Sequence, residues 1–303
     1  MTLFSKKWIV IVNVSVILIL AGCQNEASEA ESNNTDEANS NNVADIEEIV
    51  GIDPGSGTMD IAENAVEGYD LDLDLTPSSE GPMLATLDEA IKNEEPIVVT
   101  LWQPHWAFEE YDLKFLDDPQ GHLGESEKIH TLVREGLEDE KNSAYEFLDN
   151  FKWKPEDMNK ILSETKDDDV EASEVAKKWV ENNRDKVDDW KEGIAPVEDE
   201  TVELAYVNWS SAAASINVVK IALEELGYDV ELNMVDMGIA WQSLADGSID
   251  GMLMAWLPSG SDAYYKEYKD EIVDLGPNLE GARQGFVVPE YMDIDSIEEL
   301  PTK

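Results

Sequence analysis

Three tryptophans occupy equivalent places in this sequence. Trp102, Trp209 and Trp256 each end an apolar run typical of a buried strand, and each precedes a helix or a turn. In open parallel sheets, ligands bind just beyond the carboxyl ends of the strands. A single tryptophan in such a place is usually a packing residue. Three of them at equivalent strand ends indicate an aromatic binding site.

Several indole rings in one site suit a quaternary ammonium group. A trimethylammonium ion is cationic but has no N–H, so hydrogen-bond acceptors cannot hold it. Each aromatic face around the ion contributes about 0.5–2 kcal/mol of cation–π attraction. Micromolar binding corresponds to about 8 kcal/mol. The ligand therefore needs a second anchor besides the rings.

The segment Gly55-Ser56-Gly57-Thr58 can supply that anchor. It follows an apolar run and opens a helical pattern, and backbone N–H groups at a helix start favour an anion. A carboxylate bound at Gly57 and Thr58 would complete a site for a zwitterion. An ordinary tight turn is the alternative interpretation. The segment is not a dinucleotide fingerprint, because Asp60 stands where the third glycine is required.

Other site chemistries lack their motifs. His105, His122 and His130 do not have the spacing of zinc ligands. The acidic run 70–74 is not an EF-hand, because Gly81 occupies the position of the bidentate glutamate. A G-x-S-x-G nucleophile motif is also missing. The sequence therefore predicts a binding protein, not an enzyme, with no metal, no cofactor and no catalytic residues.

The elements that must position the tryptophans alternate along the chain. Short apolar runs occur at residues 49–52, 96–102, 202–209 and 252–256. Helical patterns follow the first, third and fourth of these runs, beginning near Met59, Ser210 and Asp262. This alternation predicts an α/β architecture with parallel sheets covered on both faces. Residues 138–193 have helical periodicity throughout and are expected to form a helical insert.

The charge balance is strongly acidic. The 303 residues include 21 basic and 68 acidic ones, which gives a formal net charge of −47. Such a surface repels nucleic acid and anionic headgroups, so we expect no nucleic-acid partner. It favours solubility in salty or alkaline surroundings, as in an acidic halotolerant protein. The 42% of apolar residues is enough for a folded core.

The first 22 residues have the pattern of a signal peptide. Lys6 and Lys7 precede an apolar run at 8–20, and Leu20-Ala21-Gly22-Cys23 follows it. The run is too short and wrongly flanked for a membrane-spanning helix. The final tetrapeptide resembles a bacterial lipobox.

That resemblance implies cleavage before Cys23 and lipidation of its thiol. Two acyl chains on the thioether give stable anchoring, where one would be marginal. A plain secretory signal followed by a free cysteine is the alternative. Residues 23–46 are rich in Asn, Ser, Glu, Ala and Asp, and we expect them to be a disordered acidic tether.

Several motifs recur together in one known family. They are Gly51-Ile52-Asp53-Pro54-Gly55-Ser56-Gly57, Trp102-Gln103-Pro104-His105-Trp106, Tyr111-Asp112-Leu113-Lys114, Leu204-Ala205-Tyr206-Val207-Asn208-Trp209, Ala255-Trp256-Leu257-Pro258 and Tyr264-Tyr265. In these, the sequence resembles the glycine betaine-binding lipoproteins of bacterial osmoprotectant ABC importers (OpuAC type). The resemblance extends over most of the chain, from about residue 49 to 300.

The resemblance implies a two-lobed, periplasmic-binding-protein-like fold of type II, with a hinge and a ligand cleft between the lobes. The order of the halves is that of the circularly permuted Gram-positive form. One lobe would comprise residues 47–118 plus 291–303, and the other residues 119–290. We expect a monomer that is lipid-anchored on the extracytoplasmic face of the cell membrane.

The resemblance also implies the ligand and the site. Trp102, Trp209 and Trp256 would form the cage around the trimethylammonium group of glycine betaine or proline betaine. The amides of Gly57 and Thr58 would bind the carboxylate. The protein would then deliver the ligand to an ABC permease for osmoprotection.

One position departs from the family pattern. Some members have a histidine that binds the carboxylate, where this chain has Ser261 followed by Asp262. Ser261 can still donate one hydrogen bond, whereas Asp262 would repel a carboxylate if it pointed inward. Choline, or another quaternary amine without a carboxylate, is therefore the alternative ligand. An enzyme or adhesin that keeps only the fold is a third hypothesis.

Overall fold

The computed structural model describes residues 43–124, 126–166 and 170–303. The predicted signal peptide, Cys23 and most of the predicted tether lie outside these residues. Nine strands form one hydrogen-bonded sheet in the described part, in the order β2-β1-β3-β9-β5-β8-β6-β7, with β4 paired to β9. The strands are β1 (Glu48–Val50), β2 (Asp74–Thr76), β3 (Val98–Gln103), β4 (Leu113–Phe115), β5 (Glu127–Arg134), β6 (Glu200–Tyr206), β7 (Tyr228–Met234), β8 (Gly251–Leu257) and β9 (Ile272–Pro289).

The sheet is mixed, which corrects the prediction of purely parallel sheets. Pairing is parallel among β1, β2 and β3 and among β6, β7 and β8, so these parts are as predicted. Strands β5 and β9 are antiparallel to their neighbours. Gly276, Pro277, Gly281 and Gly285 interrupt the apolar pattern of β9, so the continuous run that signals a buried strand is missing there.

Strand β9 joins two groups of strands. Its first part, up to Ala282, pairs with β5, and its last part, from Arg283, pairs with β3 and β4. We call β1–β4 and the helices beside them the first lobe, and β5–β8 with theirs the second lobe. The change of partner falls between Ala282 and Arg283.

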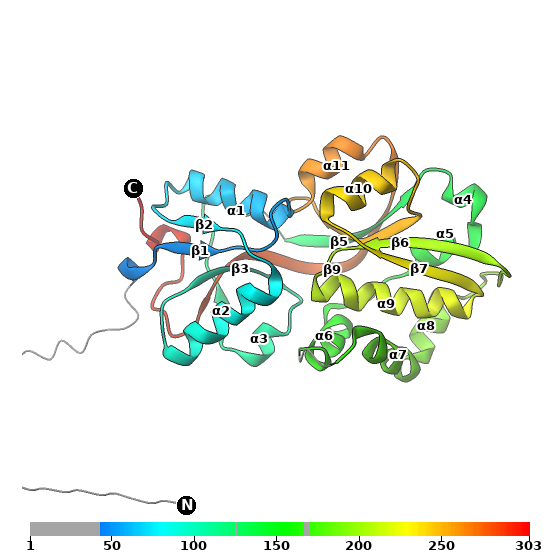
Figure 1. Ribbon diagram of the computed structural model, residues 1–303, viewed down its shortest axis with the longest axis horizontal. Helices are drawn as coiled ribbons and strands as arrows, with labels where there is room; N and C mark the ends of the chain where they lie inside the picture. The colour runs from blue at the N-terminus through cyan, green and yellow to red at the C-terminus, as the bar shows by residue number, and fades with distance from the viewer. Residues whose placement is uncertain (1–42, 125, 167–169) are drawn as a thin grey trace, which may run out of the picture. The chain divides into compact units, whose positions relative to one another are not determined.

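Helices cover both sides of the strands in the first lobe. They are α1 (Gly57–Gly68), α2 (Glu80–Asn93) and α3 (Ala107–Glu110). Figure 1 shows α1 on one side of β1–β3 and α2 and α3 on the other. Two short 3-10 helices, η1 (Val43–Asp45) and η2 (Ile297–Glu299), lie near the ends of the described chain.

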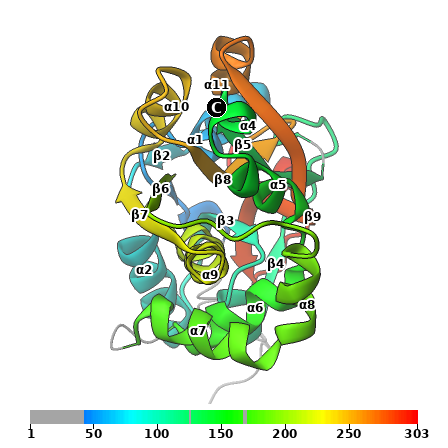
Figure 2. The ribbon, with the colours of Figure 1, turned by 90° about the vertical axis from the view of Figure 1, so that its right-hand side faces the viewer.

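The second lobe carries the remaining helices. They are α4 (Leu137–Glu140), α5 (Asn142–Asn150), α6 (Pro155–Glu164), α7 (Ala172–Asn182), α8 (Arg184–Trp190), α9 (Ser210–Glu225), α10 (Met237–Ala245) and α11 (Asp262–Tyr268). Helix α9, with α6–α8 beyond it, lies on one side of the strands, and α10 and α11 lie on the other (Figures 1 and 2). None of the helices in the described ranges is long and apolar enough to cross a membrane.

The helical stretch predicted at 138–193 contains five of these helices, α4–α8. Its expected anchors are all at most 5% exposed: Phe147, Phe151, Trp153, Ile161, Trp179 and Trp190. Burying a large apolar side chain contributes about 1.5–3 kcal/mol. The aromatic residues therefore attach these short helices firmly to the lobe.

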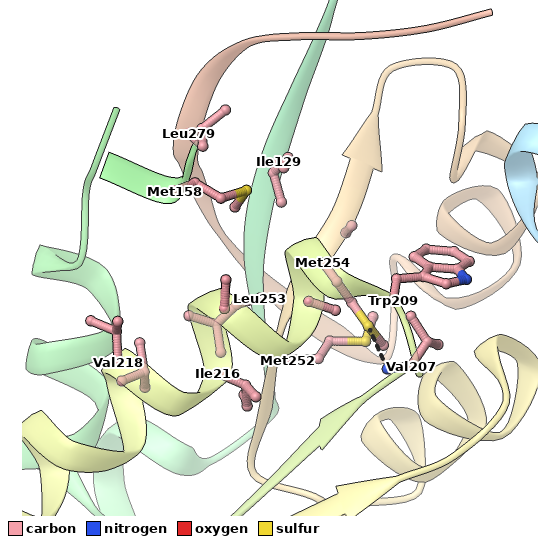
Figure 3. Close-up of a cluster of buried hydrophobic side chains, with 14 of the residues drawn as sticks. Ile129, Met158, Val207, Trp209, Ile216, Val218, Met252, Leu253, Met254 and Leu279 are labelled. Carbon is pink, nitrogen blue, oxygen red and sulfur yellow. Dashed lines mark hydrogen bonds between the residues drawn. The ribbon is translucent and has the colours of Figure 1, made fainter. Parts of the chain in front are cut away.

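The core of the second lobe extends up to Trp209. Ile216 and Val218 of α9 and Leu253 of β8 belong to one cluster of buried side chains, and the Val207 amide donates to the Met254 sulfur at 3.3 Å (Figure 3). Trp209 lies at the edge of the cluster, with its indole nitrogen pointing away from it (Figure 3). The core therefore holds the backbone that carries Trp209, while the indole extends beyond the cluster.

Candidate functional site

The three predicted tryptophans line one cavity. Trp102 is the penultimate residue of β3, Trp256 is the penultimate residue of β8, and Trp209 is the N-cap residue of α9. All three line a cavity between the lobes. They are 3%, 7% and 7% exposed, so each indole is removed from bulk water. The ends of β3 and β8 and the start of α9 therefore bring the three rings to one cavity.

Two of the rings already touch. The ring centroids of Trp102 and Trp209 are 6.0 Å apart, with their planes tilted by 45°. The space enclosed between the lining residues is about 10 Å³, which is room for about one water molecule. A trimethylammonium group can therefore enter only when the lobes part and the rings separate.

The start of α1 forms the opposite end of the cavity. Gly57 and Thr58 both line it, and the Ser56 hydroxyl caps the helix by accepting from the Met59 amide at 3.3 Å. The first N–H groups of a helix have no acceptor within the helix. Those of Gly57 and Thr58 are thus suited to an anion.

A buried polar chain runs behind this helix start. The Thr58 hydroxyl donates to Gln284 Oε1 at 2.6 Å, and Gln284 Nε2 donates to Glu127 Oε1 at 3.1 Å. Glu127 has no exposed surface. Its carboxylate also accepts from the amides of Gly260, at 2.9 Å, and Ser259, at 3.3 Å. Glu127 therefore fixes the loop that closes the cavity.

Ser261 lies in the cavity wall, and Asp262 does not. Ser261 is 3% exposed, and its hydroxyl oxygen accepts from the Trp256 amide at 3.0 Å, so its proton remains available for a ligand. The Asp262 carboxylate is 45% exposed and pairs with Lys266. The acid that could have repelled a carboxylate is therefore turned away from the site.

The lobes touch beside the cavity. The Trp209 indole N–H donates to Asp53 Oδ2 at 2.9 Å, and the Tyr264 hydroxyl donates to the Gly55 carbonyl oxygen at 2.8 Å. Burial, followed by the charge of Asp60, raises the pKa of Tyr264, so its phenol stays a donor. The two lobes are therefore closed over the cavity.

The sequence analysis missed several residues of the cavity: Ile52, Met237, Gly260 and Gln284. Ile52 lies within one recurring motif and Gly260 lies two residues after another, so position in or next to a motif could have signalled them. Gln284 lies in the interrupted pattern of β9 and reaches the site only because β9 pairs with β3 at Trp102. Within the ranges that the structure describes, no cluster of His, Cys, Asp or Glu could hold a metal ion.

These features define a class of protein. A two-lobed α/β chain that encloses an aromatic-lined cavity between its lobes has the fold of a type II substrate-binding protein. The family profile of OpuAC, the substrate binding domain of an ABC-type glycine betaine transport system, matches residues 31–182 and 200–303. The chain belongs to this family. It is therefore the extracytoplasmic binding protein of an ABC importer, with a small-molecule ligand and a permease partner, and not an enzyme.

One relative supports this assignment, and two solved structures are similar in sequence over about half of the chain. The glycine betaine/carnitine transport binding protein GbuC of Listeria monocytogenes is 48% identical over 258 residues, which cover 84% of this chain and 86% of that protein. Lactococcal OpuAC, solved in its closed-liganded conformation with glycine betaine, is 40% identical over 52% of this chain and 64% of that one, with a TM-score of 0.47. The ProX binding protein of Borrelia burgdorferi is 42% identical, covers 48% of this chain and 55% of that one, and has a TM-score of 0.46. The chain thus spans less than two thirds of each of these two structures.

Proposed function

We propose that this protein captures glycine betaine outside the cytoplasm and delivers it to an ABC permease for osmoprotection. One observation carries the proposal: three tryptophans and the first two residues of α1 line a single closed cavity. The cavity thus has an aromatic end for a cation and an amide end for a carboxylate. The relative from Listeria is named for glycine betaine and carnitine, which supports a ligand of this chemical class.

The trimethylammonium group would lie among the indoles of Trp102, Trp209 and Trp256. Each ring adds about 0.5–2 kcal/mol, with the larger values in desolvated sites such as this one. The lobes must open to admit the group, because Trp102 and Trp209 are in contact when the site is closed. Closure around the ligand would then give the permease a surface different from that of the open form.

The carboxylate would accept hydrogen bonds from the amides of Gly57 and Thr58 and from the Ser261 hydroxyl. These donors lie in a cavity with room for about one water molecule. Hydrogen bonds to a charged acceptor are about twice as strong as those between neutral groups. Ser261 would thereby replace the histidine of some family members. A choline molecule has no carboxylate and would leave the two amides without a partner, so choline is the disfavoured ligand.

The remaining proposals concern the whole chain. Residues 1–22 would be a cleaved signal peptide, Cys23 the lipidated anchor and residues 23–46 the tether that keeps the domain near the membrane. The hinge would lie between the lobes predicted at 47–118 with 291–303 and at 119–290. The protein would act as a monomer. Mass spectrometry of the membrane fraction tests the diacylated N-terminal cysteine directly.

Tryptophan fluorescence and calorimetry of the purified protein test the ligand. At fixed salt we expect saturable binding of glycine betaine, competition by proline betaine and much weaker binding of choline. Trp256→Leu should bind glycine betaine at least about tenfold more weakly, since it removes one cation–π contact and its packing. Trp190→Leu is the matched control, because Trp190 is equally buried but lies in the helical insert.

The outcomes separate the alternatives. Equal loss of binding in both tryptophan variants would contradict the cage. Tighter binding of choline than of glycine betaine would keep the aromatic end but overturn the carboxylate end. No thermal shift with any quaternary amine would overturn the proposed function.

A further inference from the structure

Glu80 is a buried acid that links the two lobes. It is the first residue of α2 and is 7% exposed. Its Oε1 lies 3.0 Å from His105 Nε2, within the first lobe. Its Oε2 accepts from the backbone amide of Ser210 at 2.8 Å, and Ser210 is the first residue of α9 in the second lobe. One carboxylate therefore holds a group from each lobe.

The hydrogen bonds of His105 fix the direction of the first contact. The Ala107 amide donates to His105 Nδ1 at 3.0 Å, so Nδ1 is an acceptor. The ring proton is then on Nε2, and His105 donates it to Glu80. His105 is 1% exposed and packs edge-on against Trp102, with ring centroids 5.2 Å apart and planes at 87°. Glu80 thus supports the imidazole that supports Trp102.

The second contact lies beside another cage residue. Ser210 directly follows Trp209, whose indole forms the facing wall of the cage. A negative charge is also favourable at the N-terminus of a 16-residue helix such as α9, where N–H groups lack partners. The bond from Ser210 to Glu80 therefore exists only when Trp209 is brought up to Trp102.

We propose that Glu80 is a positioning residue for ligand capture: with His105 it forms a latch that holds Trp102 and Trp209 together in the closed state. This inference rests on the proposed function, since the latch retains the ligand of the cage. Glu80 does not line the cavity and touches no ligand. Its effect is on closure, so the latch slows ligand release and leaves ligand entry unchanged.

The variant Glu80→Gln tests the latch. Its amide oxygen can still accept from His105, so the open protein loses little. Its amide nitrogen then faces the Ser210 N–H, so two donors meet where a donor met an acceptor. Glu89→Gln is the matched control, because Glu89 is exposed on the same helix.

Stopped-flow tryptophan fluorescence with glycine betaine gives the rates, and melting of the ligand-free protein gives the stability. We expect Glu80→Gln to release the ligand about tenfold faster, as loss of one charge-assisted hydrogen bond implies. Its association rate and ligand-free melting temperature should match those of Glu89→Gln and the wild type. A residue with only a structural role would lower the melting temperature instead.

Ser210→Pro removes the same bond from the other side. Proline is well suited to the first position of a helix, and Trp209 has φ −113° and ψ 144°, which a residue before proline readily adopts. The variant should therefore fold, lack the N–H donor and release ligand faster. Because both changes act on one contact, the double variant should release it no faster than the more affected single variant.

Small-angle scattering separates the two proposals. If wild-type protein binds no glycine betaine, the proposed function fails, and the latch is then judged by the radius of gyration without ligand. A larger radius for Glu80→Gln than for Glu89→Gln supports the latch. If the wild type binds ligand but Glu80→Gln neither speeds its release nor changes the radius in either state, the latch is overturned.

Discussion

Gly57 in the first lobe lies directly against Gly260 in the second. A Cβ atom built on Gly57 would lie 1.1 Å from the Gly260 carbonyl oxygen, and one on Gly260 would lie 2.2 Å from Gln284 Nε2. The Gly260 backbone can approach α1 this closely only because Gly57 has no side chain. The absence of a Cβ at Gly57 is therefore a condition for closing the site.

Gly57→Ala should prevent closure without harming the open protein. Gly57 begins α1, where alanine fits the helical backbone and slightly favours it. The added methyl group meets backbone atoms of the facing lobe, which cannot move away as a flexible side chain can. We expect glycine betaine affinity to fall by at least about a hundredfold, or about 2.7 kcal/mol, in a calorimetric titration.

The control for this variant lies in the same lobe. Gly81 of α2 has no atom within 4 Å of the place where its Cβ would be, so Gly81→Ala should bind as the wild type does. The ligand-free melting temperature should be unchanged or slightly raised in both variants. Near-normal affinity of Gly57→Ala would show that ligand binding does not need this contact.

Glu127→Gln should lower the stability of the protein. The buried carboxylate accepts from three N–H donors, and an amide would present a donor of its own to one of them. An unsatisfied buried group costs about 1–3 kcal/mol, and we expect a loss of this size in denaturant unfolding. The exposed Glu135→Gln should leave unfolding unchanged. If the two variants unfold alike, the carboxylate does not support the loop.

Stability should decline at high pH, in part through Tyr69. Burial, and then the hydrogen bond that its hydroxyl donates to Asp118, raises the pKa of Tyr69 to about 12. In the unfolded chain the pKa is about 10. The folded state thus binds the proton more tightly, so this stabilisation is complete below pH 10 and is lost as the pH rises through 12.

Tyr69→Phe isolates that contribution. At pH 8 the variant should be less stable by about 1–2 kcal/mol, because it loses the bond to Asp118. Between pH 10 and 12 its free energy of unfolding should fall less steeply than that of the wild type. Denaturant unfolding across this range measures both. Equal slopes for the two proteins would assign the alkaline decline to other groups.

Added salt should stabilise the protein. With a formal net charge of −47, the folded chain is strongly self-repulsive. Molar NaCl shortens the screening length to about 3 Å, which removes most repulsion between exposed carboxylates. We expect the melting temperature to rise from low to molar NaCl, and KCl to act equally. A melting temperature independent of salt would show that the acidic residues do not repel one another appreciably.

Much of the site could be predicted because its residues belong to short local patterns. Trp102 and Trp256 end continuous apolar runs, which are typical of strands covered on both faces. Gly57 and Thr58 follow such a run and begin a helix, so their free amides follow from the helix start itself. These positions depend on neighbours a few residues away, and the sequence by itself determined them.

Only the tertiary structure decided which distant residues complete the site. Gln284 meets Thr58 across 226 positions of the chain, and Glu80 meets Ser210 across 130. The outward turn of Asp262 and the antiparallel placement of β9 were likewise undetermined by sequence. Such contacts depend on which strands pair and on how the lobes close. A local pattern of apolar and polar residues determines neither. The sequence thus specified the walls of the site, whereas the packing of the lobes specified what holds them together.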